Sequence, residues 1–294
     1  MIIVRLAGGL GNQMFQYAAA RQMAHRLQTT LKLDISYYDS QQLRSYSLSP
    51  FAIQETFAAA AELTQIRGKS KNKLVKLFFR VRQNFKLFYR WTILHESHVM
   101  PVNRRLWTET GDTYLDGYWQ SEQYFQNIEP LIRREFTLKS TPDPYSQEIA
   151  AYIADTQAVS IHIRRGDYVS DAHTNRQHGT CGLEYYHACV AHISQKVERP
   201  SFFIFSDDPV WAKENLRLPH PVIVVSREDG RLQDATELWL MSLCQHHIIA
   251  NSSFSWWGAW LNPDPQKQVY APQKWYRNPH RDNADIIPET WIKI

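Results

Sequence analysis

Two arginines that lie next to each other in the sequence, near an aspartate, could bind a phosphorylated ligand. Arg164, Arg165 and Asp167 follow an apolar run at residues 158–163 that also contains His162. A guanidinium group binds two phosphate oxygens at once because its N–H groups lie in one plane. In a parallel α/β sheet, ligands bind where the strands reach their carboxyl ends, and this motif follows such a strand. The alternative is a structural ion-pair network in which Asp167 neutralises one arginine.

Two neighbouring carboxylates end another apolar run. Asp207 and Asp208 follow residues 203–206 and precede Pro209. A carboxylate at this position can accept paired N–H bonds from a guanine base. It can equally cap a helix that begins at the proline, since aspartate before proline is a common helix start. Because there are two acids, both interpretations can hold.

A third polar segment lies at a predicted helix start near residue 254. Its small polar side chains offer hydroxyls and an amide beside backbone N–H groups, and the helix dipole there favours phosphate. These residues are Asn251, Ser252, Ser253 and Ser255. Three tryptophans follow, and we expect them to pack in a core rather than to stack on sugars, because aromatic side chains dominate core burial. They are Trp256, Trp257 and Trp260.

A glycine-rich turn near the start of the chain joins a predicted strand to a predicted helix. It spans residues 8–11 and is followed by Asn12 and Gln13. Gly11 and its neighbours allow close backbone approach, and the helix start offers N–H groups to an anion. The amides of Asn12 and Gln13 can hold sugar hydroxyls. The spacing matches neither a dinucleotide-binding fingerprint nor a phosphate-binding P-loop, so a simple strand-to-helix turn is the alternative.

The elements that would position these residues alternate regularly in the second half of the chain. Apolar runs separated by amphipathic stretches favour a parallel, doubly wound sheet. The predicted strands are 159–163, 202–205, 222–225, 247–250 and 268–270, and the predicted helices are 183–197, 209–216, 235–244 and 254–261.

The first half opens in the same way and then departs from the alternation. We predict a strand at 2–6, a helix at 12–27, a strand at 31–34, mostly helix up to a strand at 113–118, and a helix at 122–136 through Pro130. The proline-rich segment at 141–144 indicates a domain boundary. The expected fold class is α/β, with two domains facing each other across a cleft.

Charge is concentrated in one segment of the 294 residues. The chain has a net charge of +4, yet the stretch from Arg67 to Arg90 carries nine lysines or arginines and no acid. Apolar residues recur at helical spacing within it. A basic amphipathic helix can pack on its own domain or lie on an anionic membrane surface. Nucleic acid is not an expected partner, because no stacking platform or groove-reading motif accompanies the charge.

Other features predict a cytoplasmic protein. We find no apolar run of the length of a membrane span and no signal-peptide pattern at the first residues. The three cysteines form no Cys-x-x-Cys pair, and we expect them to be reduced. No metal is expected, since neither a His-Glu-x-x-His motif nor an Asp-x-Asp pair occurs.

In combination, these segments resemble glycosyltransferase family 11, the bacterial-type α-1,2-fucosyltransferases. The resemblance rests on residues 8–18, 116–125, 162–168, 205–208 and 251–257. It implies a GT-B-like architecture of two Rossmann-type domains. Residues 1–145 would form an acceptor-side α/β domain with a helical insertion, and residues 146–294 a GDP-fucose-binding domain.

The resemblance also implies an activity. The enzyme would be a galactoside 2-α-L-fucosyltransferase that transfers L-fucose from GDP-fucose, with inversion and without a cofactor or metal, to the 2-hydroxyl of a galactose-terminated oligosaccharide. Contact with the inner membrane face through the basic stretch would suit a lipid-linked acceptor. The alternatives are a fucosyltransferase of another linkage and a catalytically silent nucleotide- or glycan-binding protein.

Individual roles are carried over by position. Arg164 matches the arginine on the donor's β-phosphate, while His162 and an acid at Asp207 or Asp208 match nucleotide-recognising positions. Asp167 is the candidate general base, with Asp171 and Glu122 as alternatives, and Asp167 could instead orient Arg165. The remaining expected donor-binding residues are Gly11, Asn12, Gln13, Ser253, Phe254 and Ser255.

Overall fold

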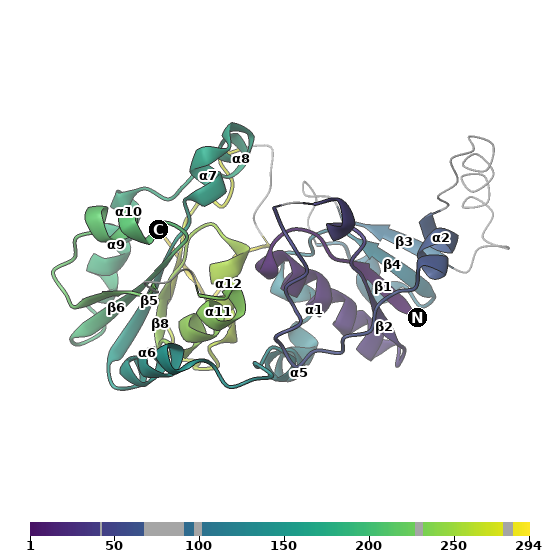
Figure 1. The fold of residues 1–294 in the computed structure, drawn as a ribbon, viewed down its shortest axis with the longest axis horizontal. Helices are drawn as coiled ribbons and strands as arrows, with labels where there is room; N and C mark the ends of the chain where they lie inside the picture. Colours follow the sequence, from purple (N-terminus) through teal and green to yellow (C-terminus); the bar gives the residue numbers. More distant parts are fainter. Residues whose placement is uncertain (42, 68–90, 97–101, 227–231, 279–284) are drawn as a thin grey trace. The chain divides into compact units, whose positions relative to one another are not determined.

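Parallel β-sheets organise both halves of the chain. The computed structural model describes residues 1–41, 43–67, 91–96, 102–226, 232–278 and 285–294. The chain divides into unit 1, formed by Met1–Ser49 and Ile53–Glu135, and unit 2, formed by Pro50–Ala52 and Phe136–Ile294. The change of unit at residue 136 precedes the predicted boundary at 145. Figure 1 shows the strands and helices of each unit.

Unit 1 contains a four-stranded parallel sheet in the order β2-β1-β4-β3. Helix α1 packs along β1 and β2, and α2 packs on a cluster formed by Ile3, Tyr114 and Ile66. The described strands are β1 (Ile2–Arg5), β2 (Leu31–Asp34), β3 (Trp91–His95) and β4 (Asp112–Asp116). The described helices are α1 (Leu10–Arg26), η1 (Tyr38–Ser40), α2 (Ala60–Arg67), α4 (Arg105–Thr108), η2 (Glu122–Tyr124), η3 (Gln126–Ile128) and α5 (Glu129–Glu135).

Two predictions for this unit are wrong. Strand β3 lies in the stretch that we expected to be mostly helical. The single helix predicted over 122–136 is instead η2, η3 and α5. Pro130 is the second residue of α5, where a backbone N–H would have no acceptor within the helix. In a helix interior, proline would remove a hydrogen bond and clash with the preceding turn. The basic stretch lies outside the described residues from residue 68 onward.

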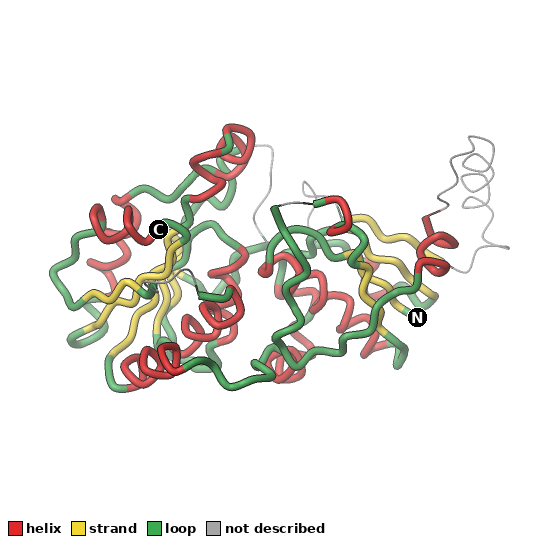
Figure 2. Tube along the Cα trace, viewed as in Figure 1, coloured by secondary structure: helices red, strands yellow, loops and turns green. Residues whose placement is uncertain are grey.

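Unit 2 contains a six-stranded sheet in the order β10-β9-β8-β5-β6-β7, and all of its pairs are parallel. The predicted alternation of strand and helix is therefore confirmed (Figure 2). The described strands are β5 (Gln157–Ile163), β6 (Pro200–Ser206), β7 (Val222–Val224), β8 (His246–Ile248), β9 (Val269–Ala271) and β10 (Ile292–Lys293). The described helices are α6 (Pro144–Ala154), α7 (Gly166–Ser170), α8 (Ala172–His178), α9 (Leu183–Ile193), α10 (Pro209–Asn215), α11 (Asp234–Leu243) and α12 (Ser253–Leu261).

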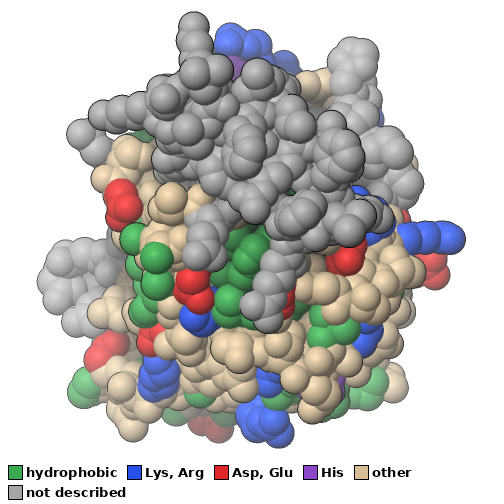
Figure 3. Space-filling view, turned by 90° about the vertical axis from the view of Figure 1, so that its right-hand side faces the viewer, with side chains coloured by type: hydrophobic (Ala, Val, Ile, Leu, Met, Phe, Trp, Pro, Cys, Tyr) green, Lys and Arg blue, Asp and Glu red, His purple; other side chains and the backbone are tan. Residues whose placement is uncertain are grey.

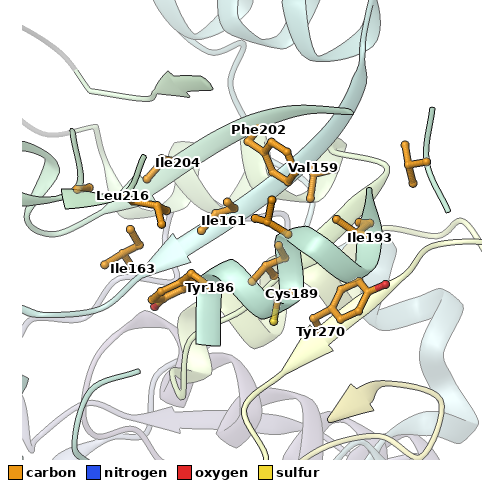
Figure 4. Packing of buried hydrophobic residues seen from close by; sticks show 14 residues of the cluster. Val159, Ile161, Ile163, Tyr186, Cys189, Ile193, Phe202, Ile204, Leu216 and Tyr270 are labelled. Atoms are coloured by element: carbon orange, nitrogen blue, oxygen red, sulfur yellow. The ribbon is translucent and has the colours of Figure 1, made fainter. Parts of the chain in front are cut away.

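Both faces of the central strands of unit 2 are buried. On β5, Val159, Ile161 and Ile163 pack against α9, as Figure 4 shows, where Tyr186 and Cys189 reach toward the sheet. Side chains alternate along a strand, so the intervening residues face the other layer. There the odd-numbered residues of β6 pack with α6 and α11 in a second cluster. Burial on both faces explains why the sequence of each of these strands is a continuous apolar run.

The sequence analysis did not predict helices α6, α7 and α8 of unit 2. The proline-rich segment expected to be a boundary starts α6, where Asp143 caps the helix and Pro144 is its first residue. Helices α7 and α8 follow β5 directly. Asp171 begins α8, since its Oδ1 accepts a hydrogen bond from the Thr174 N–H at 2.6 Å. Helices α7 and α8 are too short and too polar to show an apolar period in the sequence.

On the face shown in Figure 3, the acidic and basic side chains of the described residues are interspersed rather than gathered by sign. Among the described helices, none has the length and apolar character needed to cross a bilayer. Cys181, Cys189 and Cys244 are free thiols, as predicted.

Candidate active site

The strand order of unit 2 places a topological switch point between β5 and β8. From β5 the chain proceeds to β6 and β7 on one side of the sheet and later to β8, β9 and β10 on the other. The loops that follow β5 and β8 therefore diverge at the carboxyl ends of these strands, which is where open α/β sheets bind ligands. Arg164 follows β5 and Asn251 follows β8. The structure thus places two of the three polar segments of the second half at one switch point.

Arg164 is held between two carboxylates. Its Nη1 lies 2.9 Å from Oδ2 of Asp207, and its Nη2 contacts Oδ1 of Asp167. Burial alone would lower the pKa of Arg164, but the charges of Asp207 and Asp167 outweigh it and raise the pKa above its ordinary value. The guanidinium is therefore permanently charged, and its remaining N–H groups can bind an anionic ligand.

Arg165 has a different environment. Its guanidinium lies 3.8 Å above the ring of Trp211, and its Nε lies 3.3 Å from Oδ2 of Asp208. The suggestion that Asp167 orients Arg165 is not what the structure shows, because Asp167 contacts Arg164. The side chain of Arg165 thus packs onto α10.

Asp207 anchors the turn after β5. Its Oδ1 accepts a hydrogen bond from the Arg165 N–H at 2.8 Å, and its side chain is only 5 % exposed. The contact of its Oδ2 with Arg164 is a charge contact rather than a hydrogen bond, and within the described residues no group hydrogen-bonds this oxygen. A Cβ at Gly166 would lie 2.6 Å from the same oxygen, so only glycine allows this approach.

Asp208 begins helix α10. Its Oδ1 accepts a hydrogen bond from the Trp211 N–H at 3.1 Å, and Pro209 is the first helical residue. The capping interpretation is therefore confirmed for Asp208, while Asp207 takes the position next to Arg164. Recognition of a guanine base by either acid stays a prediction.

Helix α12 presents its N-terminus at the end of β8. Ser252 has an extended backbone and makes no side-chain capping bond, and the first intrahelical bond runs from Trp256 N–H to Ser252 O at 3.0 Å. The N–H groups of Ser253, Phe254 and Ser255 precede that bond and are suited to anion binding. The hydroxyl of Ser255 is buried and donates to the Ser252 carbonyl at 3.2 Å.

The three tryptophans of α12 are packing residues, as predicted. Trp256 and Trp257 are completely buried, and Trp260 is 4 % exposed. Their rings contact one another, with Trp256 and Trp260 stacked at 6.1 Å. This cluster fixes α12 in the core, with its first turn following the carboxyl end of β8.

His162 lines the inner side of this site. It lies on β5, is 3 % exposed, and its ring centroid is 5.5 Å from that of Phe254. The Tyr186 hydroxyl donates to its backbone carbonyl at 3.1 Å, which ties the end of β5 to α9. His162 and Phe254 therefore join the strand that carries Arg164 to the first turn of α12.

The base candidates occupy three different settings. Asp167 lies on α7 in contact with Arg164. Asp171 is exposed, and its hydrogen bond from the Thr174 N–H lowers its pKa. Glu122 belongs to unit 1 and begins η2. The choice of base among the three stays a prediction.

Gly11, Asn12 and Gln13 lie in the first turn of α1 in unit 1. The turn before them needs glycine at residue 8, which has φ +80°. Asn12 accepts a hydrogen bond from Gln120 Nε2 at 2.8 Å, which links the ends of β1 and β4. Gln13 is completely buried, and its Nε2 donates to the Ser45 carbonyl at 2.9 Å. Donor binding by this turn stays a prediction.

Tyr168 and Asn251 have positions that the sequence analysis did not anticipate. The Tyr168 ring lies 5.3 Å from the Arg164 guanidinium carbon. The Asn251 amide donates to three backbone carbonyls. Both residues lie within the segments that the sequence analysis singled out, but their partners are distant in the sequence or depend on the turn after β5, so no local pattern indicated these contacts.

The arrangement combines a charged guanidinium with the N–H groups of a helix start at one switch point of the sheet. This combination suits a ligand with two adjacent phosphates, because each phosphate can receive charge-assisted hydrogen bonds. Within the described residues, no three His, Cys, Asp or Glu side chains are grouped as a metal site requires. The residues fit phosphate binding, and independence from metal stays a prediction.

Fold and site together define a glycosyltransferase of the GT-B type. The family model of glycosyl transferase family 11 matches residues 1–294, and the chain belongs to this family. It is 33 % identical to the alpha-1,2-colitosyltransferase of Escherichia coli over 100 % of this chain and 99 % of that protein. It is 26 % identical to the galactoside 2-alpha-L-fucosyltransferase SEC1 of Bos taurus over 61 % of this chain and 51 % of that protein.

A solved structure agrees with the fold. The GDP complex of a point mutant of Arabidopsis thaliana FUT1 superposes with a TM-score of 0.52 at 11 % identity, covering 93 % of this chain and 71 % of that chain. At this identity, the likeness bears on the fold alone. The GT-B expectation and the family resemblance are thereby confirmed.

Proposed function

We propose that the enzyme transfers L-fucose from GDP-fucose to the 2-hydroxyl of a galactose residue in an oligosaccharide acceptor, with inversion and without a metal. The observation that carries the proposal is the position of Arg164 beside the N-terminus of α12 at the switch point of the unit 2 sheet. Membership of family 11 and similarity to α-1,2-transferases support the linkage.

Arg164 acts on the leaving group. Cleavage of the bond between fucose and GDP develops negative charge on the β-phosphate, so a cation placed there stabilises the transition state more than the ground state. The N–H groups at the start of α12 add to this effect. Loss of one such donor typically lowers kcat by about 10²–10³-fold, which equals about 2.7–4 kcal/mol.

Asp167 has two roles in this scheme. It contacts Arg164 before the donor binds, and an incoming diphosphate competes with it for the guanidinium N–H groups. Once displaced, its carboxylate can accept the proton of the acceptor hydroxyl. Proton transfer to a positioned base contributes about 10²–10⁴-fold to a rate.

The nucleobase would lie against unit 2 near Asp207 and His162. The Asp207 Oδ2 atom is buried without a hydrogen-bond donor among the described residues, so a ligand N–H group can supply one. Phe254, whose ring centroid is 5.5 Å from that of the buried His162, would offer the nucleobase an apolar contact.

One comparison supports a second candidate for the transferred sugar, namely colitose in place of fucose. The relative with 33 % identity is an α-1,2-colitosyltransferase, and colitose lacks the 3-hydroxyl that fucose carries. Loss of a hydroxyl that a site hydrogen-bonds lowers kcat/KM strongly, whereas a site that makes no such bond discriminates little. The ratio of kcat/KM for the two GDP-sugars therefore decides between these donors.

The test uses the purified chain with EDTA, GDP-fucose or GDP-colitose, and lactose-type acceptors. We expect a fucoside whose NMR spectrum shows an α-linkage to the galactose 2-position. A product of another linkage, strict preference for GDP-colitose or a requirement for added metal contradicts the corresponding part of the proposal. Binding of GDP without any transfer would support the silent nucleotide-binding alternative.

A further inference from the structure

The side chain of Tyr168 contacts three parts of the site. Its ring lies 5.3 Å from the guanidinium carbon of Arg164. It also stacks on His178, with ring centroids 4.9 Å apart and planes inclined by 21°. Its hydroxyl donates to the backbone carbonyl of Asn251 at 3.3 Å. Tyr168 therefore links the arginine that follows β5 to the turn that follows β8.

The Asn251 turn and His178 belong to one hydrogen-bonded assembly. The Asn251 amide donates to the backbone carbonyls of His178, Gly179 and Trp275 at 3.0, 3.2 and 3.1 Å. The buried side chain of Asn251 thus bonds to the backbone of His178, the residue whose ring stacks on Tyr168. The backbone carbonyl of Asn251 accepts the hydrogen bond of the Tyr168 hydroxyl. The residue after Asn251 is the N-cap of α12.

The aromatic contact differs in kind from the two carboxylate contacts of Arg164. Asp207 and Asp167 approach the Nη atoms, which a diphosphate also needs. An aromatic ring attracts a cation through its negatively polarised face and uses no N–H group in doing so. The contact with Tyr168 is therefore compatible with full occupation of the guanidinium by phosphate oxygens.

We propose that Tyr168 is a positioning residue that holds the Arg164 guanidinium by its ring face while the donor diphosphate occupies the N–H groups. The inference rests on the proposed function and assigns a residue that acts through Arg164. A cation–π contact of this kind changes affinity or rate by about 3- to 30-fold.

The test replaces Tyr168 with phenylalanine and with 4-fluoro-, 3,5-difluoro- and 3,4,5-trifluorophenylalanine. This series keeps the shape of the ring and progressively weakens its negative face, so a purely structural role is little affected. We measure GDP affinity by titration calorimetry, kcat and KM for the acceptor, and thermal stability for each variant.

The expected result is graded. Tyr168→Phe retains the ring, and its kcat stays within about threefold of the wild-type value. The trifluoro variant loses about tenfold in GDP affinity and in kcat relative to Tyr168→Phe. The KM for the acceptor and the melting temperature stay constant along the series. In an Arg164→Ala background, fluorination has no effect on GDP affinity, because the cation is absent.

Two results overturn the proposal. One is a flat series, and the other is an equal decline in the Arg164→Ala background, which would show that the ring acts on something other than the arginine. A wild-type enzyme that binds GDP but transfers no fucose contradicts the proposed function. The calorimetric series still tests the role of Tyr168 in that case, because it measures GDP affinity and not transfer.

Discussion

Replacing Arg164 with alanine has two separable consequences, one for stability and one for rate. The substitution leaves the carboxylate of Asp207, which is 5 % exposed, without its ion-pair partner. Breaking a buried pair by removing one partner costs about 3–5 kcal/mol, and the remaining hydrogen bond from Arg165 N–H keeps the value near the lower end. For a unit of this size, about 3 kcal/mol corresponds to a fall in melting temperature of about 6–12 °C.

The double variant R164A/D207N separates the two effects. Asparagine has nearly the shape of aspartate but no charge, so we expect it to recover about 2 kcal/mol of the lost stability. The rate is not recovered, because the cation on the leaving diphosphate is still missing. Both variants should show kcat lowered by about 10²–10³-fold.

The assay combines thermal melts with transfer kinetics on the wild type, the two variants and Arg165→Ala. Arg165 is the matched control, because it is a neighbouring arginine that packs on Trp211 and contacts Asp208. We expect it to lose less than about tenfold in kcat, since it stabilises no developing charge. Recovery of kcat in R164A/D207N, or an equal loss in Arg165→Ala, would refute the reasoning.

Three further predictions concern stability. Glu135→Gln breaks the 3.0 Å ion pair between Glu135 and Arg21. We expect chemical denaturation to show a free energy of unfolding lowered by about 3 kcal/mol, with kcat within about twofold of the wild type. An unchanged denaturation midpoint would contradict this prediction. Complete burial of His247 lowers its pKa well below 6.5, so the unfolded chain binds the proton first. Stability is therefore complete above about pH 6.5 and falls below it by up to about 1.4 kcal/mol per pH unit, a slope that His247→Gln should reduce in pH-dependent melts. Gly8→Ala should cost more than about 1 kcal/mol, because φ is +80° and the new Cβ would lie 2.6 Å from Asn12 Nδ2, and a melt equal to the wild type would contradict this.

The sheet of unit 2 could be predicted because its central strands are buried on both faces. Such strands produce continuous apolar runs, and the intervening helices have apolar stripes of their own. Strand β5 is the best example, since its run ends at Ile163 and the polar motif begins at the next residue. The carboxyl-end position of Arg164 followed from that pattern alone.

The first half was harder to predict, for identifiable physical reasons. Strand β3 (Trp91–His95) is brief and adjoins the basic stretch, whose helical spacing extended the helix prediction over it. Nothing in the sequence indicated that the segment 122–136 is divided into η2, η3 and α5, with α5 beginning one residue before Pro130. A single sequence does not contain this tertiary information.

Pairing within the site could be predicted only in part. The sequence analysis offered, as one interpretation, that Asp167 neutralises one of the two arginines, and it did not decide which. In the structure Asp167 contacts Arg164, which lies in the turn before α7 and outside the helix. The contacts of Asp207 with the β5 turn and of Asn251 with His178 join residues far apart in the chain, and no local pattern encodes them.

A crystal structure of the enzyme with GDP tests the central claim most directly. The account predicts that an oxygen of the β-phosphate lies about 2.7–2.9 Å from a nitrogen of the Arg164 guanidinium, with the first N–H groups of α12 directed at the same diphosphate. A diphosphate bound elsewhere, with Arg164 still held by Asp167 and Asp207 and more than about 6 Å from any phosphate oxygen, would contradict it.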